Sequence, residues 1–136
     1  MDNLTPADRR KTMQSVKSSK TQLENLICRE LWKSGIRFRR NVGSLLGKPD
    51  IAVKKRKIVI FVDSCFWHGC PIHLRLPNSN REYWERKILR NKDRDIVVTE
   101  YYLSRGWTVC RIWEHEIKSD LDKVISRLLA VFRPEG

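Results

Sequence analysis

The sequence predicts a small α/β domain in which a mixed β-sheet carries helices on both faces. Three observations support this fold class. The chain has 136 residues, 40% of them hydrophobic, which suffices for one domain with its own core. Short β-branched runs alternate along it with longer segments of helical periodicity. No repeat, low-complexity tract or flexible linker divides the chain, so residues 1–136 are expected to form a single domain.

The first third of the chain is expected to form two helices of different character. Thr5 and Pro6 are typical of a helix start. The polar helix that follows, to about Val16, has little apolar surface to bury, so residues 1–19 are interpreted as an arm that lies on a partner. The second helix, at residues 21–34, repeats apolar residues at helical spacing, and Gly35 ends it.

The rest of the chain is expected to supply three strands and two helices. Residues 51–53 pair with the buried, β-branched residues 58–62 through a basic turn, and residues 107–113 form the third strand. Asn80 caps a long helix that runs to Gly106. Ser119 caps the last helix, whose apolar stripe is core packing and consists of Leu121, Val124, Ile125, Leu128, Leu129 and Phe132.

The charge balance favours a polyanion as partner. Lys and Arg outnumber Asp and Glu by 28 to 16, which gives a net charge of +12. Nucleic acid is the preferred interpretation, and a solvated basic surface without a specific ligand is the alternative. No apolar run approaches the roughly 18 residues that a membrane span needs, and the N-terminus lacks the apolar stretch of a signal peptide. We therefore expect a cytoplasmic protein with no membrane partner.

The run "DSCFWHGCPIH" at positions 63–73 predicts a structural zinc site. Cys65, Cys70 and His73 are soft and borderline ligands on one tight loop, and a tetrahedral site needs a fourth. The candidates are Cys110, within the third strand, and His115, just beyond its end; His115 is favoured because a loop end reaches a loop-borne metal more easily. The alternative is that the cysteines are small buried hydrophobes.

A second set of residues in the same region suggests catalysis. His68 stands between the two cysteines, and a braced loop would display its imidazole for proton transfer, although a lone histidine is often structural. Asp50, after Pro49 at the start of a strand, places a carboxylate at a sheet end, where it can bind Mg²⁺ beside a scissile phosphate.

These motifs resemble a known nuclease family. "KPD" followed by a buried strand that ends in an acidic residue looks like the PD-(D/E)xK nuclease core, but Asp63-Ser64-Cys65 lacks the expected lysine. "CFWHGCPIH" closely resembles the signature loop of the very short patch repair (Vsr) endonucleases, which carry histidine in place of that lysine. The likeness runs from "RRKTMQSVKSSKTQLE" to "RIWEHE". It implies a restriction-endonuclease-like, three-layer α/β/α fold with a central mixed sheet, an N-terminal helical arm and a structural zinc site.

The resemblance also implies roles for individual residues. Asp50 matches the Mg²⁺-binding aspartate, and the backbone carbonyl of Val62 matches the other metal contact, so Asp63 is not required as a ligand. His68 matches the catalytic histidine and Asp95 the aspartate that orients it. Glu24 matches an acidic residue of the active site. The zinc ligands fall on Cys65, Cys70, His73 and His115.

Two of these roles have structural alternatives. Thr21-Gln22-Leu23-Glu24 is a capping box, so Glu24 can simply close a helix N-terminus. Asp95 can equally be one carboxylate of a charged helix face.

Further residues are expected to contact DNA. The resemblance implies that Phe66, Trp67 and Trp84 wedge beside a mismatch, although Trp84 can instead pack against the sheet. The arm, with Met13 at its centre, would approach the opposite groove, and Lys87 and Arg90 would hold phosphates.

The function that the resemblance implies is Mg²⁺-dependent nicking of one strand of double-stranded DNA, 5′ to the thymine of a T·G mispair left by deamination of 5-methylcytosine. We expect a monomer, at work on the bacterial nucleoid, with a functional link to a DNA cytosine methyltransferase and to repair proteins. The alternatives are a PD-(D/E)xK restriction-type endonuclease that cuts matched DNA and a zinc-braced DNA-binding module without catalysis.

Overall fold

The fold of the chain was analysed in a computed structural model that describes residues 21–66, 68–70, 76 and 79–133. Its sheet has four strands in the order β1 (Arg39–Arg40), β2 (Ile51–Val53), β3 (Ile58–Asp63) and β4 (Thr108–Trp113). β1 pairs antiparallel with β2 and β2 antiparallel with β3, whereas β3 and β4 are parallel, so the sheet is mixed as predicted. Among the described helices, none combines the length and the apolarity needed to cross a membrane.

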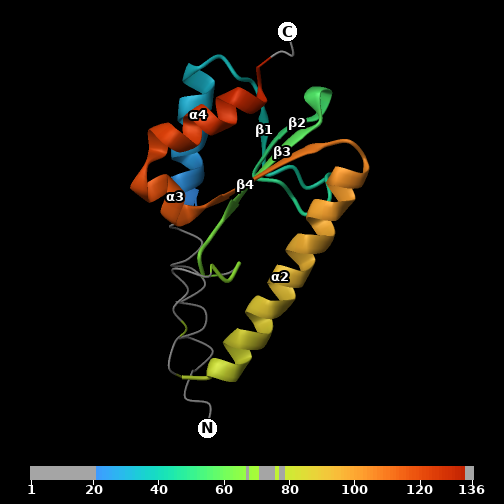
Figure 1. Cartoon of the computed structure of the whole chain (residues 1–136), viewed down its shortest axis with the longest axis vertical. Coiled ribbons are helices and arrows are strands. Elements are labelled where there is room, and N and C mark those ends of the chain that lie inside the picture. The colour runs from blue at the N-terminus through green and yellow to red at the C-terminus, as the bar shows by residue number, and fades with distance from the viewer. Residues whose placement is uncertain (1–20, 67, 71–75, 77–78, 134–136) are drawn as a thin grey trace.

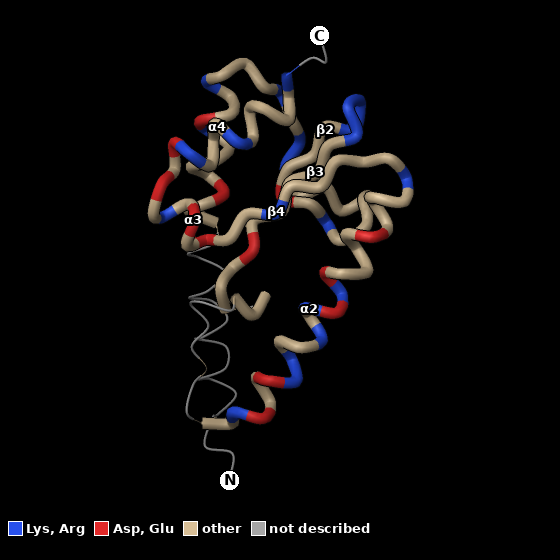
Figure 2. The backbone as a smooth tube through the Cα atoms, viewed as in Figure 1, with Lys and Arg blue, Asp and Glu red and all other residues tan. Residues whose placement is uncertain are grey.

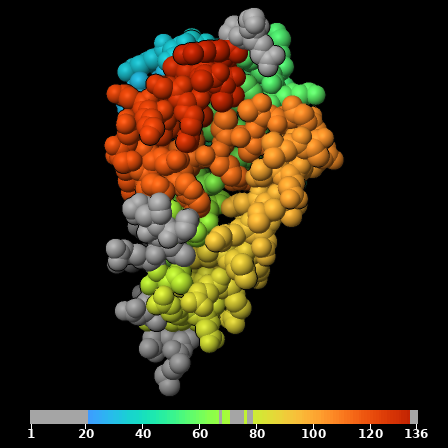
Figure 3. Space-filling view, in the orientation of Figure 1, coloured from blue at the N-terminus to red at the C-terminus, as the bar shows by residue number. Residues whose placement is uncertain are grey.

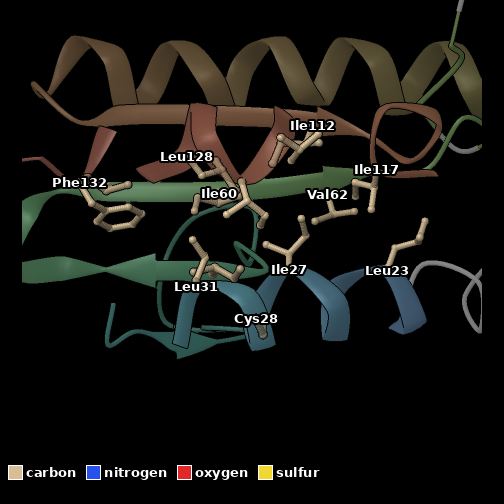
Figure 4. Close-up of a cluster of buried hydrophobic side chains, with 14 residues drawn as sticks. Leu23, Ile27, Cys28, Leu31, Ile60, Val62, Ile112, Ile117, Leu128 and Phe132 are labelled. Carbon is tan, nitrogen blue, oxygen red and sulfur yellow. The ribbon is translucent and has the colours of Figure 1, made fainter. Parts of the chain in front are cut away.

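One face of the sheet packs against three helical segments. Residues 21–33 are helical, and α3 (Glu114–Ser119) and α4 (Leu121–Val131) follow β4 directly. Ile58, Ile60 and Val62 alternate with the residues of the other face and enter a core with the apolar sides of these helices. Figure 4 shows Leu23, Ile27 and Leu31 pointing from their helix toward the strands, with Leu128 and Phe132 across the same cluster from them.

The opposite face carries α2 (Arg81–Ser104), so described helices cover both faces of the sheet (Figure 1). Val98 and Tyr102, in the C-terminal half of α2, pack against Ala52, Val59 and Phe61. The N-terminal half of α2 extends past the sheet and lies at the end of the molecule away from the sheet, the lower end in Figures 1 and 3. α2 therefore reaches from the sheet to the segment that follows β3.

The loop between β1 and β2 is fastened to α2. Tyr102 Oη donates to the carbonyl of Leu46 at 2.5 Å. Gly47 has φ +74°, and a Cβ on it would come within 2.7 Å of Val98, so glycine is required both by the backbone conformation and by the close approach.

Four local features differ from the predictions. β1 was not expected, because its two exposed arginines show none of the apolar alternation of a strand. α3 was not expected either, and α4 is capped by Asp120, whose carboxylate accepts from the Lys123 N–H at 3.1 Å, because Ser119 already belongs to α3. Asn80 does precede α2, but it has φ 57° and makes no side-chain cap.

Candidate active site

A cleft of about 750 Å³ opens on the α2 face of the sheet. Its walls are the loop at residues 43–48, the end of β3 and the middle of α2. Asp50 and His68, the two residues on which the predicted chemistry depends, both line it. Asp63, Asp95, Arg94 and Arg111 line it as well, so one concavity holds three carboxylates, an imidazole and two guanidinium groups.

Asp50 is held in place by the neighbouring strand. It is buried at the start of β2, and its Oδ2 accepts the backbone N–H of Val62 at 2.7 Å. Within a strand the N–H and C=O of one residue project to the same side, so the Val62 carbonyl also faces the strand that begins at Asp50. A carboxylate and a carbonyl are the hard oxygen donors that suit Mg²⁺, which usually binds few protein ligands and keeps several waters. This donor set therefore fits the predicted cation.

His68 is oriented by α2. Its Nδ1 lies 2.5 Å from Asp95 Oδ2, across 27 residues of sequence. Because an ionised carboxylate only accepts hydrogen bonds, Nδ1 carries the proton and Nε2 keeps its lone pair. The side chain of His68 is 20% exposed, which leaves it accessible from the cleft while its partner is fixed. The arrangement suits a general base.

The loop that carries His68 is tightly folded and pressed against α2. The His68 N–H donates to the carbonyl of Ser64 at 3.2 Å, and the Cys70 N–H donates to that of Cys65 at 3.0 Å. Gly69 has φ +62°, and a Cβ on it would lie 2.8 Å from Ile88 of α2. Glycine at this position lets the backbone beside His68 approach the helix that supplies Asp95.

Arg111 joins the carboxylates of the cleft and was missed by sequence reasoning. Its Nη1 donates to both oxygens of Asp63, at 3.0 and 3.2 Å, and its Nε donates to Thr99 Oγ1 of α2 at 2.9 Å. The same Nη1 lies 3.8 Å from Asp95 Oδ1. Arg111 thus ties β4, β3 and α2 together behind His68. The available signal was a lone arginine inside the apolar run "WTVCRIW", because a charge in mid-strand needs a partner.

Asp63 is a buried carboxylate that already has cationic neighbours. Burial raises the pKa of Asp63 above its usual value, while His68 and Arg111 act in the opposite direction. Its Oδ1 is also 3.6 Å from His68 Nδ1. With both oxygens engaged by Arg111, Asp63 is not arranged as a cation ligand.

Cys65, Cys70 and His115 form a cluster that could hold a metal ion. Their potential ligand atoms all lie within 4.8 Å of one another. His115 Nδ1 is 3.4 Å from Cys65 Sγ and 3.5 Å from Cys70 Sγ. Around a tetrahedral Zn²⁺, thiolate sulfur and imidazole nitrogen stand about 3.5 Å apart, so these separations fit zinc. Cys110 does not join the cluster; it packs at the edge of the main core.

His115 reaches the cysteines because of α3 and not, as the sequence analysis assumed, from a loop end. The same helix holds the loop by a second contact, since Glu114 Oε1 accepts the Cys65 N–H at 3.0 Å. Burial raises the pKa of the Cys65 thiol to about 11, so a metal ion would have to displace its proton on binding. His73, the fourth predicted ligand, lies outside the described residues.

The remaining predicted residues are placed as follows. Glu24 is buried and does not line the cleft; it and Asp50 both act on the thiol of Cys28, whose pKa is raised chiefly by burial. Lys87 is partly exposed with its ammonium 5.9 Å from the Tyr83 ring, and Arg90 is exposed. Met13 and Trp67 lie outside the described part of the chain.

Trp84 is packed inside the protein, which agrees in part with the alternative that it packs against the sheet. It is fully buried, and its ring meets that of Phe66 edge-on with the centroids 5.3 Å apart. It packs against the loop that follows β3, not against the sheet. Trp84 is thus covered by protein, whereas Phe66 is only partly buried.

Comparison with known proteins shows which family the chain resembles. The family model for DNA mismatch endonuclease Vsr matches residues 1–73. A type II nicking enzyme of Neisseria meningitidis serogroup C, V.NmeDIP, is 44% identical over 119 residues, which are 86% of this chain and 80% of that enzyme. A type II nicking enzyme of Haemophilus parainfluenzae, V.HpaIIP, is 40% identical over 126 residues, 90% and 89% of the two chains.

A third relative carries the family name itself. The DNA mismatch endonuclease Vsr of Escherichia coli K12 is 34% identical over 109 residues, which are 79% of this chain and 70% of that protein. The family model covers the segment with Asp50 and the cysteine-rich loop that carries His68. The chain therefore belongs to the family of Vsr DNA mismatch endonucleases and is a DNA endonuclease.

Proposed function

We propose that this protein nicks one strand of double-stranded DNA at a T·G mispair, 5′ to the thymine, in a reaction that depends on Mg²⁺. The single observation that supports this most directly is that Asp50 and His68 line one cleft, with Asp95 hydrogen-bonded to the imidazole. A DNA-binding module without catalysis has no use for a buried carboxylate facing a phosphate, because the two repel each other unless a cation lies between them.

The residues divide the chemistry between them. Asp50 and the Val62 carbonyl would hold Mg²⁺, which supplies charge to the scissile phosphate when it is bound. His68 takes a proton from the attacking water at Nε2, because Nδ1 is committed to Asp95. Asp95 fixes the tautomer and stabilises the imidazolium that forms. Glu24, which does not line the cleft, stays a predicted member of the active site.

The second part of the proposal concerns the loop that carries His68. Cys65, Cys70 and His115, together with His73, would bind Zn²⁺ in a closed structural site that leaves the chemistry to other groups. The loop would then present His68 to the backbone, and Phe66 with Trp67 and Trp84 to the mispaired step. The core is proposed to be of the restriction-endonuclease type, with residues 1–19 as a DNA-contacting arm of the single domain.

The second candidate function is that of a restriction-type endonuclease that cuts matched DNA. The relatives named as type II nicking enzymes, without a mismatch in their names, are the observation that favours it. The experiment that separates the two uses one duplex sequence in two forms, with T·G or T·A at a single position and a different label on each strand. Products are resolved on denaturing gels with and without Mg²⁺.

We expect Mg²⁺-dependent cleavage of the T-containing strand alone, immediately 5′ to the thymine, in the T·G duplex. The T·A duplex, which differs by one base, is the control. Equal cleavage of both duplexes would support the restriction-type alternative. Binding without cleavage of either duplex, at every Mg²⁺ concentration and over a panel of flanking sequences, would refute the proposal.

A further inference from the structure

A second concavity lies beside the cleft, at the edge of the sheet. It measures about 460 Å³ and is walled by Arg37, Arg39, Lys54 and Lys55 over an apolar floor that includes Val42 and Ala52. We call it the edge groove. None of its lining residues is shared with the cleft.

The edge groove is the centre of an unusually basic segment. Residues 37–57 contain eight lysines and arginines, all exposed, and a single acidic residue, Asp50, which is buried and faces the cleft. Figure 2 shows Lys and Arg gathered at the end of β2, where the helical turn Lys54–Arg56 begins. Much of the protein's net charge of +12 is therefore concentrated along one edge.

These charges are held in position but are not neutralised within the described residues. The Arg37 guanidinium stacks on Trp32, 3.7 Å from the ring centroid, and donates to the Trp32 carbonyl. Lys54 Nζ donates to Ser44 Oγ at 3.3 Å. Each of these contacts is with an uncharged group, and the ion pairs of the described residues lie elsewhere. Like charges crowded in this way oppose folding unless a polyanion offsets them.

The edge groove and the cleft open on the same face of the sheet. Ala52 belongs to the cluster under α2, and Arg39 is its direct partner across β1 and β2, so both side chains project to the α2 face. The loop between β1 and β2 separates the two concavities, since Val42 lines one and residues 43–48 line the other. A long ligand in the cleft can therefore continue over this loop into the groove.

We propose that the edge groove binds backbone phosphates of duplex DNA on one side of the nick, outside the mispaired step. This rests on the proposed function, because it extends the substrate of the same site. Arginine and lysine side chains that find no carboxylate partner suit phosphate oxygens, and the release of condensed counterions drives such binding. The contact adds affinity without reading sequence, so it anchors the duplex while the cleft acts on the mispair.

The test uses the double variant Arg39→Glu/Lys55→Glu and the matched control Lys33→Glu/Lys123→Glu. Both change the net charge by the same amount at exposed positions, and the control residues lie on helices that cover the opposite face of the sheet. Equilibrium binding is measured by fluorescence anisotropy at several salt concentrations. The duplexes carry a T·G mispair and are either short or lengthened by one helical turn, about 10 base pairs, on either side.

We expect the groove variant to bind the duplex lengthened on one side several-fold more weakly than the wild type. On that duplex, the negative slope of log K against log [salt] should be less steep by about 1.8, because each lost phosphate contact accounts for about 0.9. The short duplex and the one lengthened on the other side should be bound, and nicked, as well as by the wild type. The control variant should behave as the wild type on all three.

Three outcomes would overturn the proposal. They are an equal loss in both double variants, an equal loss on all duplexes, and no loss on any. Loss of binding to anionic phospholipid vesicles with unchanged DNA binding would assign the groove to a membrane surface. Because the measurement is binding, it remains decisive even if the wild-type protein fails to nick the T·G duplex, which is how a failure of the proposed function would appear.

Discussion

His68 shows how the chemistry of the cleft depends on single atoms. The contact between its Nδ1 and Asp95 decides which ring nitrogen is left to act as a base. Arg111 lies behind both, in contact with Asp63, Asp95 and Thr99. Two predictions belong to this scale, one for the base and one for the arginine.

Replacing His68 by Ala should lower the nicking rate by about 10² to 10⁴-fold, which is the usual contribution of a general base. Affinity for a T·G duplex should change little, because the imidazole is not needed to hold the DNA. Single-turnover nicking and anisotropy measure the two quantities. Asp95→Asn serves as the companion variant and should slow nicking by disturbing the tautomer; full activity in both variants would remove the pair from the mechanism.

Replacing Arg111 by Met should destabilise the fold in a way that depends on pH. The variant leaves the Asp63 carboxylate buried beside one fewer cation, and breaking a buried pair from one side costs about 3–5 kcal/mol when the remaining group is charged. Burial already raises the pKa of Asp63, and the loss of Arg111 raises it further. A carboxyl with a raised pKa in the folded state is neutral below that value, so the destabilisation should be largest at pH 8 and shrink as the pH falls.

Urea unfolding of wild type and variant at pH 8 and pH 5 checks this. Only the difference between the two proteins is used, so that any loss of metal at low pH cancels. Adding Asp63→Asn to Arg111→Met should recover much of the stability at pH 8, since no charge is then left unpaired. A difference that does not vary with pH would show that Arg111 contributes through packing alone.

Among the elements, both α2 and α3 contact the described residues of the segment 64–70. Glu114 and His115 of α3 hold it on one side, and Ile88 of α2 packs against Gly69 on the other. Because it lies between these two helices, a metal in the cysteine cluster would stiffen the connection between them as well as the loop itself.

We expect the protein to bind one zinc ion and to lose it in Cys65→Ser or Cys70→Ser. Cys110→Ser is the matched control and should keep the metal, because Cys110 lies outside the cluster. Metal content by mass spectrometry and the melting temperature report the two effects. A structural zinc stabilises the fold, so its removal by chelation should lower the melting temperature of the wild type and of Cys110→Ser. Equal metal content in all three variants would contradict the assignment.

For the whole molecule, the main core lies on the face of the sheet opposite the cleft. Leu128 of α4 is completely buried there, among residues of the first helix and of β3 and β4. The cleft is built on the other face, by α2 and the loop at residues 43–48. The main core and the cleft therefore lie on opposite faces of the sheet.

Leu128→Ala should cost about 2–5 kcal/mol of unfolding free energy, through lost transfer energy and the cavity that remains. The nicking rate well below the melting temperature should stay within a few-fold of wild type, because no residue that lines the cleft belongs to this core. Denaturant unfolding and single-turnover nicking measure the two effects. A large fall in rate at a temperature where the variant is fully folded would show that the core positions the site directly.

The amino-acid sequence by itself determined the parts that depend on neighbours along the chain. The helix at residues 21–33, the β2–β3 pair and the stripe of α4 follow from local periodicity, and the loop with His68 and two cysteines follows from one short motif. The basic character and the family likeness are also properties of the sequence alone.

The tertiary structure alone decided which distant side chains meet. Arg111 reaches Asp63 across 48 residues because β4 runs parallel beside β3 with Arg111 in register with Phe61. Trp84 is buried because α2 continues past the sheet onto the loop, and β1 exists only because β2 offers its edge. Periodicity records which face of an element is apolar, but it carries no information on which element covers that face. That choice placed Arg111, three carboxylates and the imidazole in one cleft.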